Sequence, residues 1–167
     1  MATAYAFSSL VPDSSFPART SVGNLYTIEF QYTLAGAVVT GDTFTTPVNG
    51  LPSNGIRIAE VEVITPRLDT NATPTGTFIV GDATDDNRFI DAAPMGVTGI
   101  TSTTYQIRQV INIAQGLTAG VVSTGTNYLY GSGTAPRLVM TLGGTVATAQ
   151  TAGTIRMRVS FYCTDEN

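Results

Sequence analysis

The feature that most constrains this chain is an alternation of apolar and polar residues with a period of two. In residues 26–34 every second side chain is apolar, and residues 154–163 repeat the pattern. Successive side chains of a β-strand point to opposite faces, whereas an α-helix brings a residue back to the same face only after 3.6 positions. Both stretches therefore predict antiparallel strands with one buried face and one face open to solvent or to another subunit.

A third stretch alternates in the same way but changes phase. Ile56 and Ile58 share a phase that Val61 and Val63 do not, because the step from 58 to 61 is odd. One extra residue in a strand shifts the phase in this way, so we predict a β-bulge near Ala59 and Glu60. The bulge leaves a set of charged side chains on the outer face: Arg57, Glu60 and Glu62.

Short runs rich in Thr and β-branched residues fill most of the remaining chain. They predict further strands at residues 37–46, 76–81, 87–91, 103–113, 121–130 and 136–147. Pairs such as Gly41-Asp42, Asn49-Gly50 and Asn54-Gly55 lie between the runs and favour tight turns. The fold class is therefore all-β, an antiparallel β-sandwich whose strand number and spacing favour a jelly roll. The Cys, Trp, Cys pattern of an immunoglobulin sandwich is absent.

The chain has 167 residues, which is enough for one hydrophobic core. We expect an extended N-terminal arm at residues 1–23 and a single β-sandwich domain at residues 24–167, because Pro12 and Pro17 interrupt the first segment. The arm also carries apolar residues that must be buried somewhere, either on its own core or on a neighbouring subunit. The second alternative makes Tyr5, Phe7, Leu10 and Phe16 interface residues.

Composition excludes several classes of function. The chain has no His, and all 8 of its basic residues are Arg, so Ser-His or Cys-His catalysis and His-ligated zinc are excluded. A net charge of −4 disfavours free nucleic acid as a partner, because DNA and RNA binding depends on clustered cationic side chains. We expect no cofactor and no enzymatic activity.

The only cysteine, Cys163, cannot form a disulfide within the chain, which favours synthesis in a reducing compartment such as a host cytoplasm. No stretch of about 18 apolar residues is present, so we expect no transmembrane helix and no membrane partner.

An acidic segment at residues 81–91 is the densest polar cluster. Asp82, Asp85 and Asp86 could bind a hard cation such as Ca²⁺, although their spacing is not that of an EF-hand loop. A hairpin loop in which Asp82 and Asn87 bond to nearby backbone groups explains the same residues.

Glu60 and Glu62 share a strand face at about 7 Å, near the separation of the two carboxyl groups in inverting glycosidases. The alternative is structural, with these carboxylates paired to Arg156, Arg158 or Arg57 across the sheet. Because Arg is enriched at protein interfaces and Lys is depleted, Arg156 and Arg158 are also candidate interface residues.

Tyr128 and Tyr130 precede a Gly-Ser-Gly turn and have three possible roles: core packing, an interface anchor or a ligand platform. As a platform for a glycan they would act with Asp85 and Asn87.

The run from Leu68 to Asp82, followed by Asp86, Arg88-Phe89-Ile90 and Ala92, resembles small virion proteins of tailed bacteriophages. Residues 26–30 and 39–44 carry the same resemblance. It implies a β-rich capsid decoration or cement protein, commonly a homotrimer, that lies on the capsid surface and bridges major capsid proteins. Two alternatives remain: a tail, adaptor or fibre-associated jelly roll that binds carbohydrate, and an enzyme that uses Glu60 and Glu62.

Overall fold

A computed structural model describes residues 1–9, 25–100, 102, 106–112, 128–133 and 135–163. In these residues the chain forms strands and loops and no helix, so the predicted all-β class is confirmed. The strands are β1 (Ala4–Ala6), β2 (Ser8–Ser9), β3 (Leu25–Thr33), β4 (Thr43–Thr45), β5 (Asn54–Pro66), β6 (Thr77–Gly81), β7 (Ile90–Pro94), β8 (Gln106–Asn112), β9 (Leu129–Ser132), β10 (Val139–Gly143) and β11 (Thr154–Cys163). None of the described segments is a helix long and apolar enough to span a bilayer.

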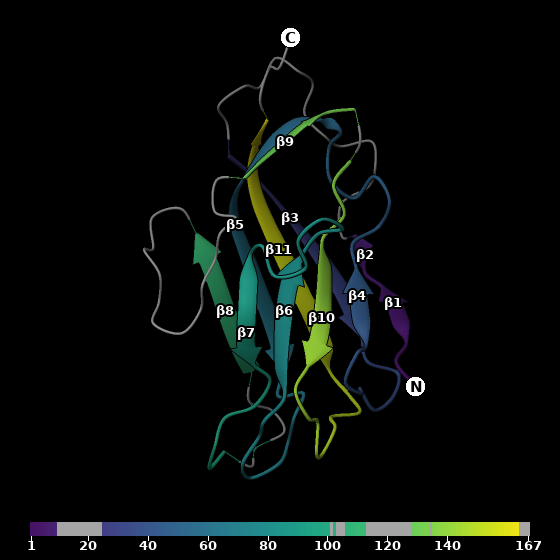
Figure 1. Ribbon diagram of the computed structural model, residues 1–167, viewed down its shortest axis with the longest axis vertical. Helices are drawn as coiled ribbons and strands as arrows, with labels where there is room; N and C mark the ends of the chain where they lie inside the picture. Colours follow the sequence, from purple (N-terminus) through teal and green to yellow (C-terminus); the bar gives the residue numbers. More distant parts are fainter. Residues whose placement is uncertain (10–24, 101, 103–105, 113–127, 134, 164–167) are drawn as a thin grey trace.

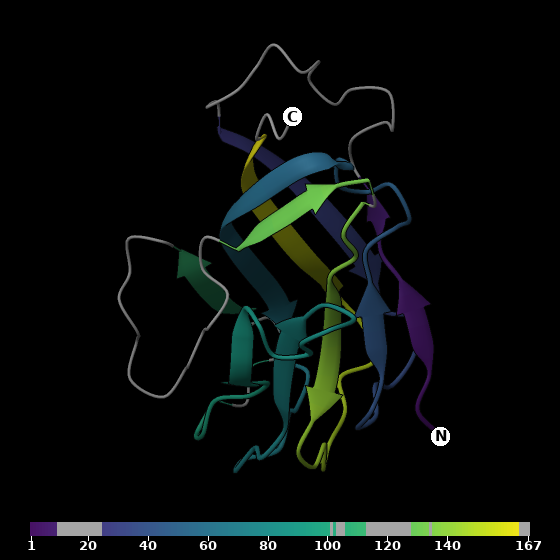
Figure 2. The same cartoon turned by 45° about the horizontal axis from the view of Figure 1, so that its top comes forward.

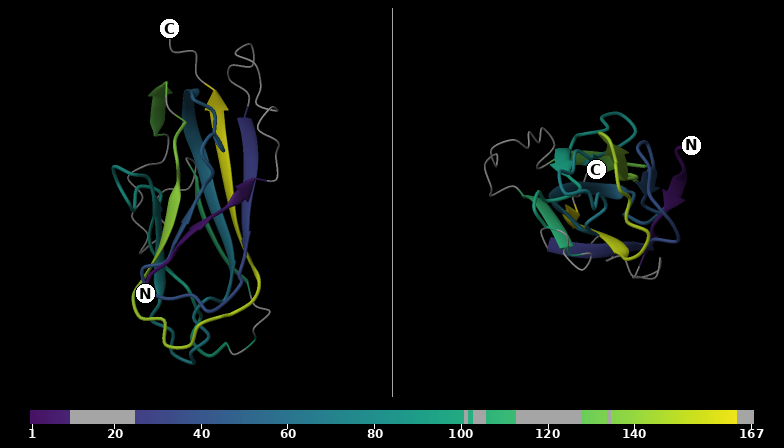
Figure 3. Two further views of the ribbon diagram at one scale, coloured as in Figure 1. Left: turned by 90° about the vertical axis from the view of Figure 1, so that its right-hand side faces the viewer. Right: turned by 90° about the horizontal axis from the view of Figure 1, so that it is seen from below.

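The strands form two sheets that face each other (Figure 1). The first sheet has the order β1-β4-β10-β6-β7, and the second has the order β2-β3-β11-β5-β8 with β9 also paired to β5. Viewed from the side, the two sheets lie as two layers along the length of the molecule (Figure 3). Apart from the parallel pair β1 and β4, the strand pairs are antiparallel.

The core lies between the inner faces of the two sheets. On β11 the alternation predicted from sequence is borne out, because Ile155, Met157, Val159 and Phe161 are buried. The same core contains the fully buried aromatic side chains Phe30, Phe44, Phe78, Phe89 and Phe161. Burial of these inward faces supplies the main driving force that holds the sheets together.

The predicted bulge is present in β5. Ser160 of β11 pairs with Glu60, and the next residue, Phe161, pairs with Ile58, so Ala59 is the extra residue. The bulge keeps both halves of β5 in phase with the core, since Ile58 and Val61 are each 1% exposed. The phase change in the sequence therefore located a specific irregularity of the backbone.

Three local predictions were wrong. The strand predicted at residues 87–91 begins only at Ile90 and runs to Pro94, because the backbone N–H of Arg88 bonds back to Asp85 within the preceding loop. Only Thr43–Thr45 of the predicted strand at residues 37–46 is a strand, because Val39 and Gly41 belong to a turn in which Gly41 has φ +89°. Asn54-Gly55 is not a turn between strands but the start of β5, where Gly55 takes φ +78° and Asn54 pairs with Ser132 of β9. Most of the strand predicted at residues 121–130 lies outside the described residues.

The first nine residues contribute a strand to each sheet. β1 pairs with β4 at the edge of the first sheet, and β2 pairs with β3 at the edge of the second. The chain thus passes from one sheet to the other along a single side of the sandwich (Figure 2). Residues 10–24 lie outside the described part of the chain.

Candidate functional site

The acidic segment forms the loop between β6 and β7, and its shape depends on Gly81. A Cβ atom at Gly81 would lie 2.0 Å from the carbonyl oxygen of Asp85, so only glycine allows the loop to fold back so closely. The backbone N–H of Asp82 then donates to that same carbonyl over 2.8 Å. This turn aims the Asp82 side chain into the space between the loop and β9.

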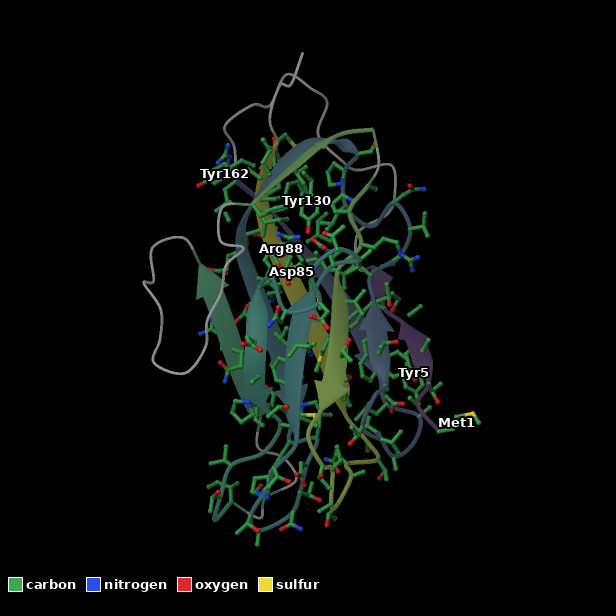
Figure 4. The ribbon with its side chains drawn as sticks, viewed as in Figure 1. Met1, Tyr5, Asp85, Arg88, Tyr130 and Tyr162 are labelled. Carbon is green, nitrogen blue, oxygen red and sulfur yellow. The ribbon has the colours of Figure 1, made fainter. Side chains whose placement is uncertain are left out.

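The Asp82 carboxylate accepts hydrogen bonds at both oxygens. Oδ1 accepts from the backbone N–H of Thr84 (2.8 Å), the Thr84 hydroxyl (2.7 Å) and the backbone N–H of Asp85 (3.0 Å). Oδ2 accepts from Arg88 Nε (2.8 Å) and from the Tyr130 hydroxyl (2.6 Å). Because Asp82 follows β6 and Tyr130 lies on β9, the bond from Tyr130 joins the two sheets, whereas the bond from Arg88 stays within the β6–β7 loop. Figure 4 shows Tyr130 next to Arg88 and Asp85 of this loop.

Arg88 also packs on an aromatic ring. Its guanidinium carbon lies 3.9 Å from the centroid of the Tyr128 ring, a cation–π contact. Tyr128 in turn meets Tyr130 edge to face, with centroids 4.8 Å apart. We refer to Asp82, Arg88, Tyr128 and Tyr130 as the Asp82 cluster.

The environment of the cluster changes the acidity of its members. Burial acts to raise the pKa of Asp82, but hydrogen bonds from Tyr130, Thr84 and Arg88 outweigh it and lower this pKa to about 2. Burial and the bond to Asp82 both raise the pKa of Tyr130. For Arg88, burial acts to lower the pKa, but the hydrogen bond to Asp82 and its charge prevail and raise it. Asp82 and Arg88 are thus held as an ion pair.

The same contacts bear on the two ligand predictions for this loop. Both oxygens of Asp82 are occupied by protein donors, and Asp86 is exposed. Among the described residues no group of three or more His, Cys, Asp or Glu side chains is placed to hold a metal ion. As for a glycan platform, the Tyr130 hydroxyl is bonded to Asp82 and Arg88 covers one face of Tyr128. The arrangement is that of a structural contact between the β6–β7 loop and β9.

A second polar cluster lies on the outer face of the other sheet. Arg158 of β11 stands in register between Glu29 of β3 and Glu62 of β5. Its Nε donates to Glu29 over 2.5 Å and its Nη1 donates to Glu62 over 3.2 Å. The hydrogen bond and charge of Glu29 raise the pKa of Arg158. We refer to Glu29, Arg158 and Glu62 as the ion-pair row.

The structural interpretation of the paired glutamates accounts for Glu62. This side chain is on the outer face, as expected, but it is only 3% exposed because Arg158 and Arg108 bind its two oxygens. Arg108, of the edge strand β8, was not singled out from the sequence. Arg156 keeps 46% of its side chain exposed, and its Nε lies 3.8 Å from Glu29.

The predicted interface residues of the arm fall into two groups. Phe7 is 3% exposed and belongs to the core of its own chain, whereas Tyr5 is half-buried against Phe44, with ring centroids 5.0 Å apart. Leu10 and Phe16 lie outside the described residues.

An apolar pocket opens beside Tyr5 on the side of the sandwich where β1 lies. Its volume is about 150 Å³. It is lined by Tyr5, Tyr32, Leu34, Ala35, Gly36 and Val38. The Tyr5 and Tyr32 rings are 5.0 Å apart, and burial, the neighbouring Tyr5 and the charge of Asp42 raise the pKa of Tyr32. No sequence pattern indicated this pocket, because its walls come from β1, from the end of β3 and from the loop that follows.

No protein-family model and no curated protein matches the sequence. The fold, in contrast, is similar to chains of two solved phage structures. One belongs to the cyanophage Pam1 capsid asymmetric unit, with a TM-score of 0.59 and 24% identity over 90% of this chain and 92% of that chain. The other belongs to the capsid of Ralstonia phage GP4, with a TM-score of 0.64 and 19% identity over 90% and 91%. This chain therefore shares its fold, along almost its whole length, with chains found in phage capsid structures.

Proposed function

We propose that this protein is a non-enzymatic structural component of a phage virion, and more specifically a capsid decoration or cement protein. The observation that carries the proposal is the likeness to two chains from phage capsid structures. Each match covers nine-tenths or more of both chains, so the similar chains are of nearly this chain's length. A short all-β chain that belongs to a capsid is what the resemblance in the sequence implied.

We also infer that the sandwich is a jelly roll. Eight of the strands support this inference by their order: β3-β11-β5-β8 in one sheet and β4-β10-β6-β7 in the other. Successive strands mostly alternate between the sheets, and the last strand, β11, lies between β3 and β5. Jelly rolls occur in viral capsid proteins and also in lectins, so the fold alone does not assign the function.

The proposed action is thermodynamic. A subunit that binds only the assembled lattice lowers the free energy of that state by RT ln(1 + [L]/Kd) per site. Such a role requires rigidity and complementary surfaces. The described residues provide rigidity through two sheets joined by the Asp82 cluster.

For the contact surface we propose the β1 side of the sandwich, including Tyr5, and the exposed Arg156. Of the two predicted interface arginines, Arg156 makes the weaker contact within its own chain, 3.8 Å from Glu29. Arg158 is instead bonded to a glutamate on each side. Arg is suited to such contacts because its planar group binds carboxylates in a bidentate manner. The partner in this proposal is the major capsid protein, and the protein acts as a homotrimer on the capsid surface.

The proposal is tested by adding the purified protein to capsids assembled from the major capsid protein of the same phage without it. We expect saturable co-sedimentation and added density at a fixed lattice position by cryo-electron microscopy. Light scattering is expected to give about three times the 17.5 kDa chain mass. Absence of binding to expanded capsids would contradict the decoration role, whereas a monomer mass with normal binding would contradict only the trimer.

A charge-reversal pair locates the surface. Arg156→Glu is expected to reduce the affinity for capsids at least tenfold. Arg137→Glu is the matched control, because Arg137 is also exposed but lies at the start of the β10 region in the opposite sheet. Equal affinities for the two variants would remove Arg156 from the interface.

A further inference from the structure

The edge that β1 forms differs from the opposite edge of the same sheet, which β7 forms. In the described part of the chain β1 pairs only with β4, in parallel, and forms the end of the first sheet. The bonds to β4 use alternate residues, since the Thr3 carbonyl accepts from Thr43 N–H and the Phe7 N–H donates to Thr45. Parallel pairing therefore turns the backbone groups of Ala4 and Ala6 away from the sheet. Figure 2 shows β1 along the outer margin of the molecule.

The opposite edge of the same sheet, β7, is protected against pairing. It contains the charged residue Asp91, it ends at Pro94, which has no N–H, and Ala92 has φ +49°. Its pairing with β6 is also irregular between Phe78 and Val80. Charges, prolines and bulges are the devices by which natural edge strands avoid added strands.

The β1 edge has none of these devices. From Ala2 to Ser9 the sequence contains no charged side chain and no proline. The outward side chains of Ala4 and Ala6 are small and exposed, so a second backbone can approach without hindrance. An extended strand that pairs here would complete backbone hydrogen bonds that no described residue of the chain is recorded as making.

The pocket beside Tyr5 gives this edge side-chain selectivity. Residues paired across a sheet point to the same face, so the residue opposite Tyr5 would point inward, as Tyr5 does, toward the pocket. The pocket volume is about 150 Å³. An apolar cavity of about this size is known to accept benzene. The fitting occupant is therefore an aliphatic or aromatic side chain of Leu or Phe size.

A second copy of the chain does not meet this requirement through its own β1. Antiparallel pairing of two β1 edges about Tyr5 would place one Tyr5 opposite the other. Each Tyr5 ring is already stacked on Phe44 of its own chain, with an angle of 18° between the ring planes. Neither ring would then fill the pocket of the other copy.

We propose that the β1 edge is a docking site for an extended, uncharged strand of a different protein, which places a Leu- or Phe-sized side chain in the Tyr5 pocket. The site is defined by the outward backbone of Ala4 and Ala6 and by the pocket that Gly36 helps to line. It does not depend on the virion role, because its specificity comes from backbone bonds and one side chain.

The test uses synthetic seven-residue peptides of alternating Thr and Val, with a central Phe, Leu or Asp. Binding is followed by the amide chemical shifts of the full-length protein in NMR titrations. We expect the Phe and Leu peptides to perturb Ala4, Ala6 and Gly36, and to bind at least tenfold more tightly than the Asp peptide. Equal affinities for all three peptides, or perturbation centred on β7, would overturn the proposal.

Two variants separate the backbone site from the pocket. Ala6→Pro removes an outward N–H but leaves the β1–β4 bonds, which use the neighbouring residues. Gly36→Leu adds an apolar side chain to a residue that lines the pocket, and a Cβ atom at Gly36 meets no atom within 4 Å, so the fold should tolerate it. Each variant is expected to weaken the Phe peptide at least tenfold with an unchanged thermal midpoint. If wild type self-associates and Ala6→Pro abolishes this, the partner is a second copy and the proposal is wrong.

Discussion

The Asp82 cluster and the ion-pair row are both built around an Arg–carboxylate pair, but they differ in exposure. The Arg88 and Asp82 side chains are 12% and 6% exposed, whereas Arg158 and Glu29 are 40% and 20% exposed. The side chain of Glu62 in the row is itself only 4% exposed, but both arginines that bind it, Arg158 and Arg108, are exposed, at 40% and 66%. A buried pair that loses one partner leaves an uncompensated charge in a medium of low dielectric constant, whereas an exposed pair is screened by water and salt. The comparison indicates that the Asp82 cluster stabilises the sandwich more than the ion-pair row does.

The largest effect is expected from Asp82→Asn. This change keeps the shape of the side chain but removes the closer and more buried of the two carboxylates paired with Arg88, since Asp85 lies 3.8 Å away and is 31% exposed. We expect a loss of about 3 kcal/mol in the free energy of unfolding, measured by urea denaturation. Glu29→Gln in the ion-pair row is the matched control and should cost less than about 1 kcal/mol. Equal losses would contradict the comparison.

The second prediction concerns the pH dependence of stability, to which the Asp82 cluster contributes through the lowered pKa of Asp82. The pKa of Asp82 is lowered from 3.8 to about 2 in the folded protein, so folding favours its ionised form. Its contribution is fully present above pH 3.8 and is lost as the pH falls toward 2. A lowering of this size corresponds to about 2 kcal/mol in the free energy of unfolding. Between pH 5 and pH 2 the free energy of unfolding, measured by urea denaturation, should fall by this amount in wild type. It should fall by less in Asp82→Asn, because the amide does not titrate.

Sequence patterns predicted the sheets better than the contacts between them. The alternation in residues 154–163 and the phase change at Ala59 depend only on whether a side chain faces inward, and both predictions are confirmed. Those features are local, because the period of a strand is a property of its own backbone. Lengths and turns were less well predicted, since Asn54-Gly55 is compatible with both a turn and a twisted strand start.

The clusters required information that is not local. Asp82 and Tyr130 are 48 positions apart, and nothing in either segment indicates the other. The sequence analysis assigned Asp82 to a metal loop and joined Tyr130 to that loop only through Asp85 and Asn87, as a glycan platform. The pairing of Glu62 with Arg158 was among the sequence alternatives because both residues alternate onto an outer face. The position of Arg108 beside Glu62 depends on the order of the strands in the sheet, which no single segment encodes.

A smaller effect is expected from Tyr130→Phe, which removes one hydrogen bond to Asp82 and keeps the ring. We expect a loss of about 1 kcal/mol. The variant should also raise the pKa of Asp82, because the Tyr130 hydroxyl is one of the donors that lower it. The acid midpoint of unfolding should therefore move to higher pH. An unchanged midpoint would mean that the bond between the sheets does not hold in solution.

The smallest losses in the free energy of unfolding are expected from substitutions in and beside the ion-pair row. Arg158→Gln breaks bonds to both Glu29 and Glu62, and because Glu62 is 3% exposed its charge is not freely hydrated after the change. Arg156→Gln removes only a 3.8 Å contact from a side chain that is 46% exposed. We expect losses of about 1 kcal/mol and less than about 0.5 kcal/mol, respectively.

The salt dependence of these losses in stability should distinguish the ion-pair row from the Asp82 cluster. The Debye length falls from about 10 Å at 0.1 M to about 3 Å at 1 M ionic strength, so the loss in Arg158→Gln should shrink as NaCl is added. The loss in Asp82→Asn should persist, because its charges are buried. A salt-independent loss in Arg158→Gln would mean that Arg158 stabilises the sheet by packing its aliphatic stem across β3 and β5, and not through its charge.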